Sequence, residues 1–237
     1  MDVNFPPAEQ LLIVSPHLDD AVFSCGTLMA MRPGVTVLTV FAGIPSAPGI
    51  VTEWDRISGF GDAVEAMQSR REEDRQALGV LAAHPLWLDF LDGQYRPLDA
   101  EREVSAALKD IIDKLEPQQI FIPAGLFHTD HEAVHRALMA VYRNWPENSW
   151  WLYEEPLYRR VPGLLQRRLS ALLADGRCAT PRSLFDSAAT ELKRAAIRCY
   201  PSQLRALKQR VGAVDDLLDI EGYWHLSDSP VHNGEHG

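Results

Sequence analysis

Hydrophobic side chains occur in two kinds of segment, which alternate along the chain. Short apolar runs, typical of buried strands, occupy residues 11–15, 35–41, 85–91, 119–122 and 150–153. Longer segments, in which apolar residues recur with helical spacing, occupy residues 21–31, 62–82, 98–115, 131–142 and 188–208. Strands that alternate with helices form βαβ units, whose strands pair in parallel. The pattern therefore predicts a Rossmann-like three-layer α/β/α protein with a mostly parallel sheet.

Two segments interrupt this alternation. Residues 43–61 contain four glycines and two prolines and predict a long irregular loop, which in a compact domain is usually functional or mobile. Residues 156–185 include Pro156, Pro162 and Pro181 and predict a mixed segment without clear periodicity. Because no repeat or linker separates these parts, we expect residues 1–237 to form one domain, with a disordered tail at 228–237.

The charge balance narrows the classes of partner. With 23 basic and 33 acidic side chains the formal net charge is −10, whereas nucleic-acid binders carry basic stripes and anionic membranes attract basic patches. No apolar window approaches the ~18 residues of a membrane span, and the N-terminus lacks the pattern of a signal peptide. The three cysteines form no CxxC pair. We therefore expect a reduced, cytoplasmic protein with no nucleic-acid partner and no membrane span.

A histidine and two aspartates follow the first predicted strand, in Pro16-His17-Leu18-Asp19-Asp20. Ligands of open α/β sheets gather at the carboxyl ends of the strands. An imidazole and two carboxylates at that place can supply two metal ligands and one base. Asp19 and Asp20 also lie where a helix N-cap belongs, and aspartate is a favoured cap. This cluster alone leaves both interpretations open.

A second cluster, His128-Thr129-Asp130-His131, follows the strand predicted at 119–122. Asp130 also suits a helix N-cap. Taken together, however, the two clusters offer His17, Asp20 and one of the later histidines as ligands at one edge of one sheet. Three protein ligands and a water are typical of a catalytic zinc ion, which lowers the pKa of that water towards ~7.

A rival motif overlaps the second cluster. The run His131-Glu132-Ala133-Val134-His135 matches H-E-x-x-H, the metalloprotease signature. Such a site needs a third ligand, for which Glu154 or Glu155 is available. The helix, however, belongs to a βαβ alternation rather than to the centre of a protease domain.

The same residues resemble the PIG-L/LmbE family of zinc-dependent de-N-acetylases. Pro-His-Leu-Asp-Asp is similar to the family's A/P-H-P-D-D motif, and His-Thr-Asp-His to its H-x-D-H motif. Weaker matches support this resemblance: Arg70–Glu73 is similar to an R-x-x-E helix and Leu91–Gly93 to an L-x-x-D-G turn. The segment Lys193–Gln203 is similar to a K-x-x-A…S-Q helix.

The resemblance implies specific roles for the residues of both clusters. Asp19 is the general base that acts on a metal-bound water. His128 stabilises the oxyanion or acts as an acid, and Asp130 tunes it. The implied zinc ligands are His17, Asp20 and His131.

The resemblance also implies that Arg70 and Asp92 contact the sugar. The chain departs from the family pattern at two positions. Leu18 replaces a proline without removing a ligand. Leu126 stands where a relative has a catalytic tyrosine, which leaves that acid role vacant.

We therefore predict an LmbE-like fold and a metal-dependent deacetylase, with one Zn²⁺ per chain. It would release acetate from a small-molecule N-acetylated amino sugar or its glycoconjugate. A His₂Asp site also accepts Fe²⁺ or Co²⁺. The alternatives are the zinc protease and a non-catalytic sugar- or metal-binding homologue. The sequence is compatible with a monomer and with a homo-oligomer. We expect the segments 43–61 and 154–185 to determine which substrate is bound.

Overall fold

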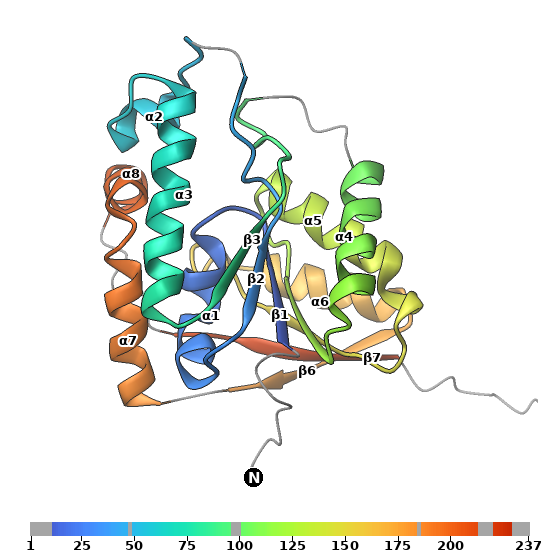
Figure 1. Ribbon diagram of the computed structural model, residues 1–237. Helices are drawn as coiled ribbons and strands as arrows, with labels where there is room; N and C mark the ends of the chain where they lie inside the picture. Colours follow the sequence, from blue (N-terminus) through green and yellow to red (C-terminus); the bar gives the residue numbers. More distant parts are fainter. Residues whose placement is uncertain (1–10, 47–48, 96–100, 184–185, 213–219, 229–237) are drawn as a thin grey trace, which may run out of the picture.

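A mixed β-sheet forms the centre of the molecule in the computed structural model, which describes residues 11–46, 49–95, 101–183, 186–212 and 220–228 (Figure 1). Within these residues the strand order is β3-β2-β1-β4-β5-β7-β6. The pairs from β3 to β5 are parallel, whereas β7 is antiparallel to both β5 and β6. The strands are β1 Leu11–Ser15, β2 Thr36–Thr39, β3 His84–Trp87, β4 Gln119–Pro123, β5 Ser149–Tyr153, β6 Arg177–Arg182 and β7 Tyr223–Asp228.

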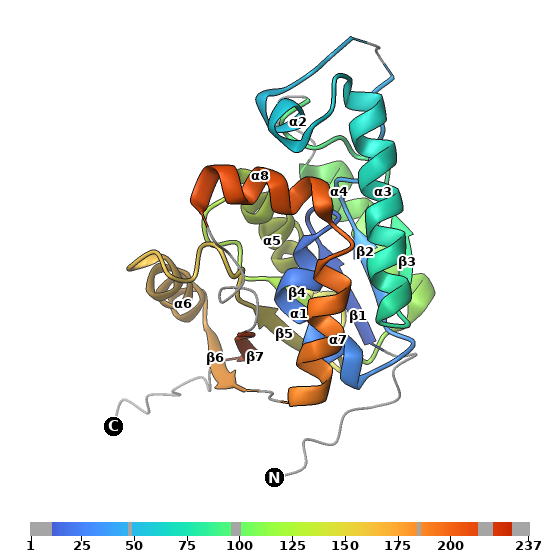
Figure 2. The ribbon, with the colours of Figure 1, turned by 90° about the vertical axis from the view of Figure 1, so that its left-hand side faces the viewer.

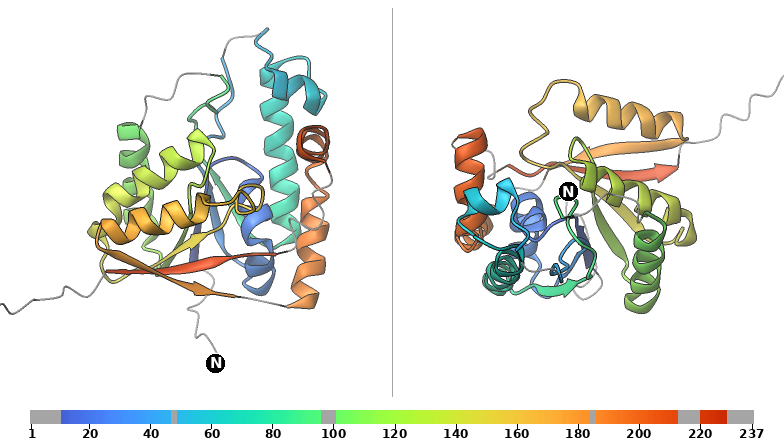
Figure 3. Two further views of the ribbon diagram at one scale, coloured as in Figure 1. Left: turned by 180° about the vertical axis from the view of Figure 1, so that it is seen from behind. Right: turned by 90° about the horizontal axis from the view of Figure 1, so that it is seen from above.

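Helices cover both faces of the sheet (Figure 2). Successive residues of a strand point to opposite faces. Accordingly, Leu11 and Ile13 of β1 pack with α1, α3 and α7, whereas Leu12 and Val14 pack with α4, α5 and α6. The view from above separates these two layers (Figure 3). The helices are α1 Asp20–Met31, α2 Glu53–Ser58, α3 Ala63–Val80, α4 Glu101–Leu115, α5 Thr129–Val141, α6 Leu164–Ala174, α7 Ser187–Ile197 and α8 Pro201–Val211.

This architecture confirms the predicted three-layer α/β/α fold with a mostly parallel sheet. Several details differ from the sequence-based expectation. The loop expected at 43–61 contains the short helix α2, whose N-cap Thr52 forms a capping box with Asp55. The single helix expected at 188–208 is two helices, because Pro201 cannot continue α7 and instead begins α8. The strand expected at 85–91 ends at Trp87.

The segment after Pro156 adds to the same sheet. It contributes α6, β6 and, further along the chain, the strand β7. Asp228, expected to begin the tail, is the last residue of β7, and residues 229–237 lie outside the described part of the chain. No helix in the described segments has the length and apolar character needed to span a bilayer.

Candidate active site

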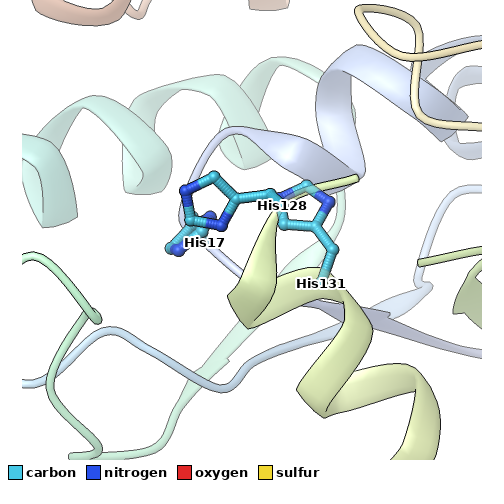
Figure 4. Close-up of side chains that lie close together, drawn as sticks. All are labelled: His17, His128 and His131. Carbon is cyan, nitrogen blue, oxygen red and sulfur yellow. The ribbon is translucent and has the colours of Figure 1, made fainter. Parts of the chain in front are cut away.

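The two sequence clusters meet because β1 and β4 are parallel neighbours, which places their carboxyl ends at the same edge of the sheet. His17 comes from the loop after β1, whereas His128 caps α5 and His131 lies in its first turn. The three imidazoles face one another with ring centroids 5.1–5.3 Å apart (Figure 4). Each of them offers a nitrogen within 4.8 Å of the others.

Asp20 lies between two of these rings. Its Oδ2 is 3.2 Å from Nδ1 of His17 and 3.1 Å from Nε2 of His131. Two ligand atoms at ~2.0–2.1 Å from one tetrahedral ion are about 3.3 Å apart. Each separation is that of two ligands of one divalent cation, so Asp20 can share an ion with either ring. Among the described residues, the groups of three potential ligands that lie within 4.8 Å of one another are His17 with His128 and His131, and His17 with Asp92 and Asp130, and neither contains Asp20. One ion held by His17, Asp20 and His131, the ligands implied by the resemblance, therefore stays a prediction.

Asp130 contacts His17 rather than His128. Its buried Oδ2 lies 2.8 Å from Nε2 of His17 and accepts a 3.0 Å hydrogen bond from the backbone of Gly93. Only the backbone N–H of Asp130 reaches His128, where it donates to Nδ1 over 3.3 Å. Metal-binding histidines usually hold a carboxylate at their outer nitrogen. The resemblance implies that Asp130 tunes His128, because the fold that brings Asp130 to His17 is not visible in the local pattern.

The side-chain contacts do not support the interpretation that the aspartates of the two clusters are helix N-caps. Asp19 occupies the N-cap position of α1 but makes no capping hydrogen bond. His128, not Asp130, is the cap of α5. The Asp19 carboxylate instead lines the cavity.

Burial and the neighbouring charges raise the pKa of Asp19 and lower the pKa values of Asp20 and His128. Burial, together with the charge of Asp20, raises the pKa of Asp19 to about 7. Burial also acts to raise the pKa of Asp20, but the adjacent His131 and His17 outweigh it and hold that pKa well below its ordinary value. Burial, with the charges of His17 and His131, lowers the pKa of His128 to about 4. At neutral pH, Asp19 can thus exchange a proton while His128 is uncharged.

The pKa of His131 is shifted upwards, in the opposite direction to the pKa of His128. Burial acts to lower its pKa, but the carboxylates of Asp20 and Glu155 outweigh this effect and raise the pKa to about 9. The Nδ1 atom of His131 lies 3.3 Å from Oε1 of Glu155. A bound cation would compete with the proton on Nε2, because both require the same lone pair.

A cavity of about 420 Å³ opens above the cluster. Its volume is within the range of small-molecule sites. Polar and charged side chains, including those of the cluster, form part of its lining, and apolar side chains from several elements form the rest. The apolar residues include Trp54, Met67, Leu157 and Leu207.

Both residues predicted to contact the sugar line this cavity. The guanidinium of Arg70 is already held by Asp55, with Nη2 3.0 Å from Oδ1, and its Nε is buried without a described partner. Asp92 lies 3.9 Å from Nε2 of His17. Both carboxylate oxygens of Asp92 accept hydrogen bonds from Gln94.

A hydrogen bond from Tyr200 holds the backbone of the loop after β1. The carbonyl of Leu18 accepts a 3.0 Å hydrogen bond from the hydroxyl of Tyr200, which also lies 2.8 Å from Oδ1 of Asp74. A hydroxyl has one proton, and a carbonyl can only accept. When Tyr200 donates to Leu18, Asp74 must therefore donate to Tyr200. Burial raises the pKa of Asp74 to about 7, which favours this protonated form.

The H-E-x-x-H pair does not form a metal site. His135 is buried, with Nδ1 2.9 Å from the carbonyl of Pro123. Burial and the charge of Arg168 lower its pKa to about 3. Among the described residues, one of the two groups of three potential ligands that lie close together includes His131, and neither includes His135. The protease arrangement is thus not supported by the geometry.

Several residues of the cavity lining were not predicted from the sequence, and Tyr158 and Trp54 are two of them. Leu126 is buried and lies outside the cavity lining, but the hydroxyl-bearing Tyr158 lines the cavity with its ring 5.8 Å from that of His131. Trp54 reaches the cavity from α2, within the segment expected to be irregular. No local motif marks either residue, because long-range packing brings both to the site.

Comparisons with known proteins identify the family and the fold of the chain. The chain is 33% identical over 146 residues to 2'-N-acetylparomamine deacetylase of Streptomyces fradiae, a match that covers 54% of this chain and 50% of that protein. The chain thus spans about half the length of this curated relative. A triple mutant of a deacetylase from the teicoplanin biosynthetic pathway superposes with a TM-score of 0.77 and 27% identity, covering 94% of this chain and 99% of that one.

The zinc-inhibited form of teicoplanin deacetylase gives a TM-score of 0.76 with 25% identity, and covers 93% of this chain and 99% of that one. The family model for GlcNAc-PI de-N-acetylase matches residues 12–142, more than half of the chain, and this range contains both His/Asp clusters. The resemblance drawn from the two motifs is therefore confirmed, and the chain belongs to the PIG-L family.

Proposed function

We propose that this protein is a metal-dependent hydrolase that removes the N-acetyl group from an amino sugar or its glycoconjugate. The observation that carries the proposal is the position of Asp20 Oδ2, about 3 Å from a nitrogen of His17 and a nitrogen of His131, with the carboxylate of Asp19 beside it in the cavity. The deacetylases among its relatives support the reaction class.

The donor set suits a divalent ion, and Zn²⁺ is the metal that we propose. His17, Asp20 and His131 would hold it, and a His₂Asp set accepts Fe²⁺ or Co²⁺ as well. When bound, such an ion supplies a Lewis acid for the amide carbonyl and lowers the pKa of a water molecule.

The proton transfers fall to Asp19. A carboxylate with a pKa of about 7 can take a proton from the attacking water near neutral pH. The same group can return that proton to nitrogen as the C–N bond breaks, which yields acetate and the free amine. Its neighbour Asp20 is held ionised by two histidines and cannot perform this exchange.

His128 is suited to stabilise the developing oxyanion. Its Nδ1 accepts the backbone N–H of Asp130, so that in the neutral ring the proton is on Nε2. An uncharged imidazole with a fixed tautomer donates one hydrogen bond without a competing charge. Arg70 and Asp92, on the cavity wall, are proposed to contact sugar hydroxyls.

Acetate release from a panel of N-acetylated sugars and acetylated peptides tests the proposal. We expect zinc-loaded wild type to deacetylate at least one sugar, and Asp19→Ala to lose activity by about 100- to 10,000-fold while it still binds zinc. The matched control is Glu132→Ala, which retains activity under this proposal. Loss of peptide hydrolysis in Glu132→Ala, with Asp19→Ala active, would instead establish the protease. Sugar binding without turnover would establish a non-catalytic homologue.

A further inference from the structure

Glu155 lies directly beyond the carboxyl end of β5, next to the loop that leads into α5. Its side chain is almost fully buried, with 2% exposure. The Oε1 atom accepts hydrogen bonds from the backbone N–H of Gly125 over 2.7 Å and of Leu126 over 3.2 Å. The same oxygen lies 3.3 Å from Nδ1 of His131. One carboxylate oxygen thus contacts both the loop before His128 and the outer nitrogen of His131.

These contacts determine which nitrogen of His131 keeps its hydrogen. A carboxylate only accepts, so Nδ1, which faces Glu155, carries a hydrogen. Nε2 faces a second carboxylate, with Oδ2 of Asp20 3.1 Å away, and a cation would have to take the place of the proton there while Glu155 keeps the hydrogen on Nδ1. His17 has the equivalent arrangement, because Asp130 holds its outer Nε2 while Nδ1 faces Asp20.

Because Glu155 is buried, its negative charge is costly unless nearby groups compensate it. A buried carboxylate is unfavourable unless donors or cations compensate its charge. The other oxygen of Glu155, Oε2, is buried without a described hydrogen-bond partner. The described contacts that compensate its charge are therefore the two backbone N–H groups and the imidazole of His131, all at Oε1.

We propose that Glu155 is a positioning residue of the metal centre, which fixes the ring and tautomer of His131 so that Nε2 is presented to the ion. The inference rests on the proposed function, because it assumes that His131 is a ligand. By holding Gly125 and Leu126, Glu155 also fixes the loop before His128. A single carboxylate therefore couples the ligand His131 to the segment that carries the oxyanion donor.

The variant Glu155→Gln tests the charge while it retains an oxygen that can accept the backbone hydrogen bonds. Its matched control is Glu154→Gln. Glu154 is the neighbouring carboxylate and accepts from Nε1 of Trp224 over 2.8 Å. The readout is the zinc dissociation constant, measured by competition with a chromophoric chelator on protein stripped of metal. We expect about 10- to 100-fold weaker binding for Glu155→Gln and no change for Glu154→Gln.

Equal zinc affinity of folded Glu155→Gln and wild type would overturn the inference, as would an equal loss in Glu154→Gln. If Glu155→Gln does not fold, Glu155→Asp takes its place. It keeps the charge but is one methylene too short to reach both loop and ring, and unchanged affinity there would overturn the inference too. At saturating zinc, kcat should fall while KM stays constant.

The outcomes also separate this inference from the proposed function. Weakened zinc binding in Glu155→Gln, in a protein that deacetylates no sugar, would support the positioning role and contradict the activity. Sugar deacetylation with unaltered zinc affinity would contradict only the role of Glu155. A wild-type protein that binds no zinc would contradict both.

Discussion

Arg70 and Asp55 form a buried ion pair beneath the cavity wall, with Nη2 3.0 Å from Oδ1 and side-chain exposures of 6% and 0%. Asp55 belongs to α2 and also accepts a 2.7 Å hydrogen bond from the hydroxyl of Tyr95. The pair therefore joins α3 to the segment at 43–61. Arg70 is both a cavity residue and an anchor for α2, which supplies the wall residue Trp54.

The first prediction concerns this pair. Asp55→Ala leaves the guanidinium of Arg70 buried without its carboxylate, and we expect a loss of about 3–5 kcal/mol in the free energy of unfolding. Urea titration monitored by circular dichroism measures it. The control is Glu53→Ala in the exposed pair with Arg210, for which a change of at most about 1 kcal/mol is expected. Similar values for the two variants would contradict the structural role of the pair.

The second prediction distinguishes the three clustered histidines. If His128 is an oxyanion donor, His128→Ala keeps about one zinc per chain and loses roughly 100- to 1,000-fold in kcat. His131→Ala, which removes a ligand, should lose the zinc itself. Elemental analysis of untagged protein, together with acetate assays, measures both. Loss of zinc from His128→Ala would make His128 a ligand.

The third prediction concerns pH and Asp74. Its pKa is raised from 3.8 to about 7, chiefly by burial, which outweighs the lowering effect of the hydrogen bonds that Asp74 shares with Tyr200 and Trp87; the charge of Asp19 adds to the rise. The folded protein therefore keeps a proton that the unfolded chain releases between these values. The stability from Asp74 is thus fully present below pH 3.8 and is lost as pH rises to about 7.

Asp74→Asn should remove this dependence. Its amide can donate to Tyr200 and accept from Trp87, which reproduces the hydrogen bonds of the protonated acid. We expect the stability of wild type relative to the variant to fall by a few kcal/mol between about pH 5 and about pH 8. Urea unfolding at both pH values measures this difference. A constant difference would show that Asp74 is ionised throughout the range.

The fourth prediction concerns the buried pair of Lys193 and Glu221, whose Nζ and Oε1 atoms are 2.6 Å apart. Glu221 also accepts the backbone N–H groups of Thr27 and Leu28, which α1 leaves available because its backbone departs from helical geometry at Cys25.

Lys193→Met leaves the Glu221 carboxylate without its cation, and we expect a loss of about 3–5 kcal/mol in the free energy of unfolding. Chemical denaturation measures this loss. The exposed pair Lys109–Asp113 provides the control, since Lys109→Met should change stability by at most about 0.5 kcal/mol. The double variant Lys193→Met/Glu221→Gln should recover part of the loss, and no recovery would argue against an electrostatic origin.

The sequence predicted the features that depend on local pattern. The strands ending at Ser15 and Pro123 are apolar and parallel, so the residues that follow them had to meet at one edge of the sheet. The partners of those residues were not predictable, because Asp130 reaches His17 across 113 positions and Glu155 reaches His131 across 24. The strands β6 and β7 were missed for a similar reason. Their residues are polar at many positions and gain strand structure only by pairing with each other and with β5.

The hydrogen bond from Tyr200 to Leu18 spans 182 positions of the chain, and this span has a consequence for biosynthesis. The family match ends at residue 142, so a nascent chain of that length already contains every proposed ligand. It lacks Glu155, which orients His131, and Tyr200, which holds the loop of His17 and Asp20. Synthesis must therefore reach Tyr200, the residue that precedes α8, before all of these contacts can form. A product that terminates near residue 142 would carry both His/Asp motifs without the side chains that hold them in place.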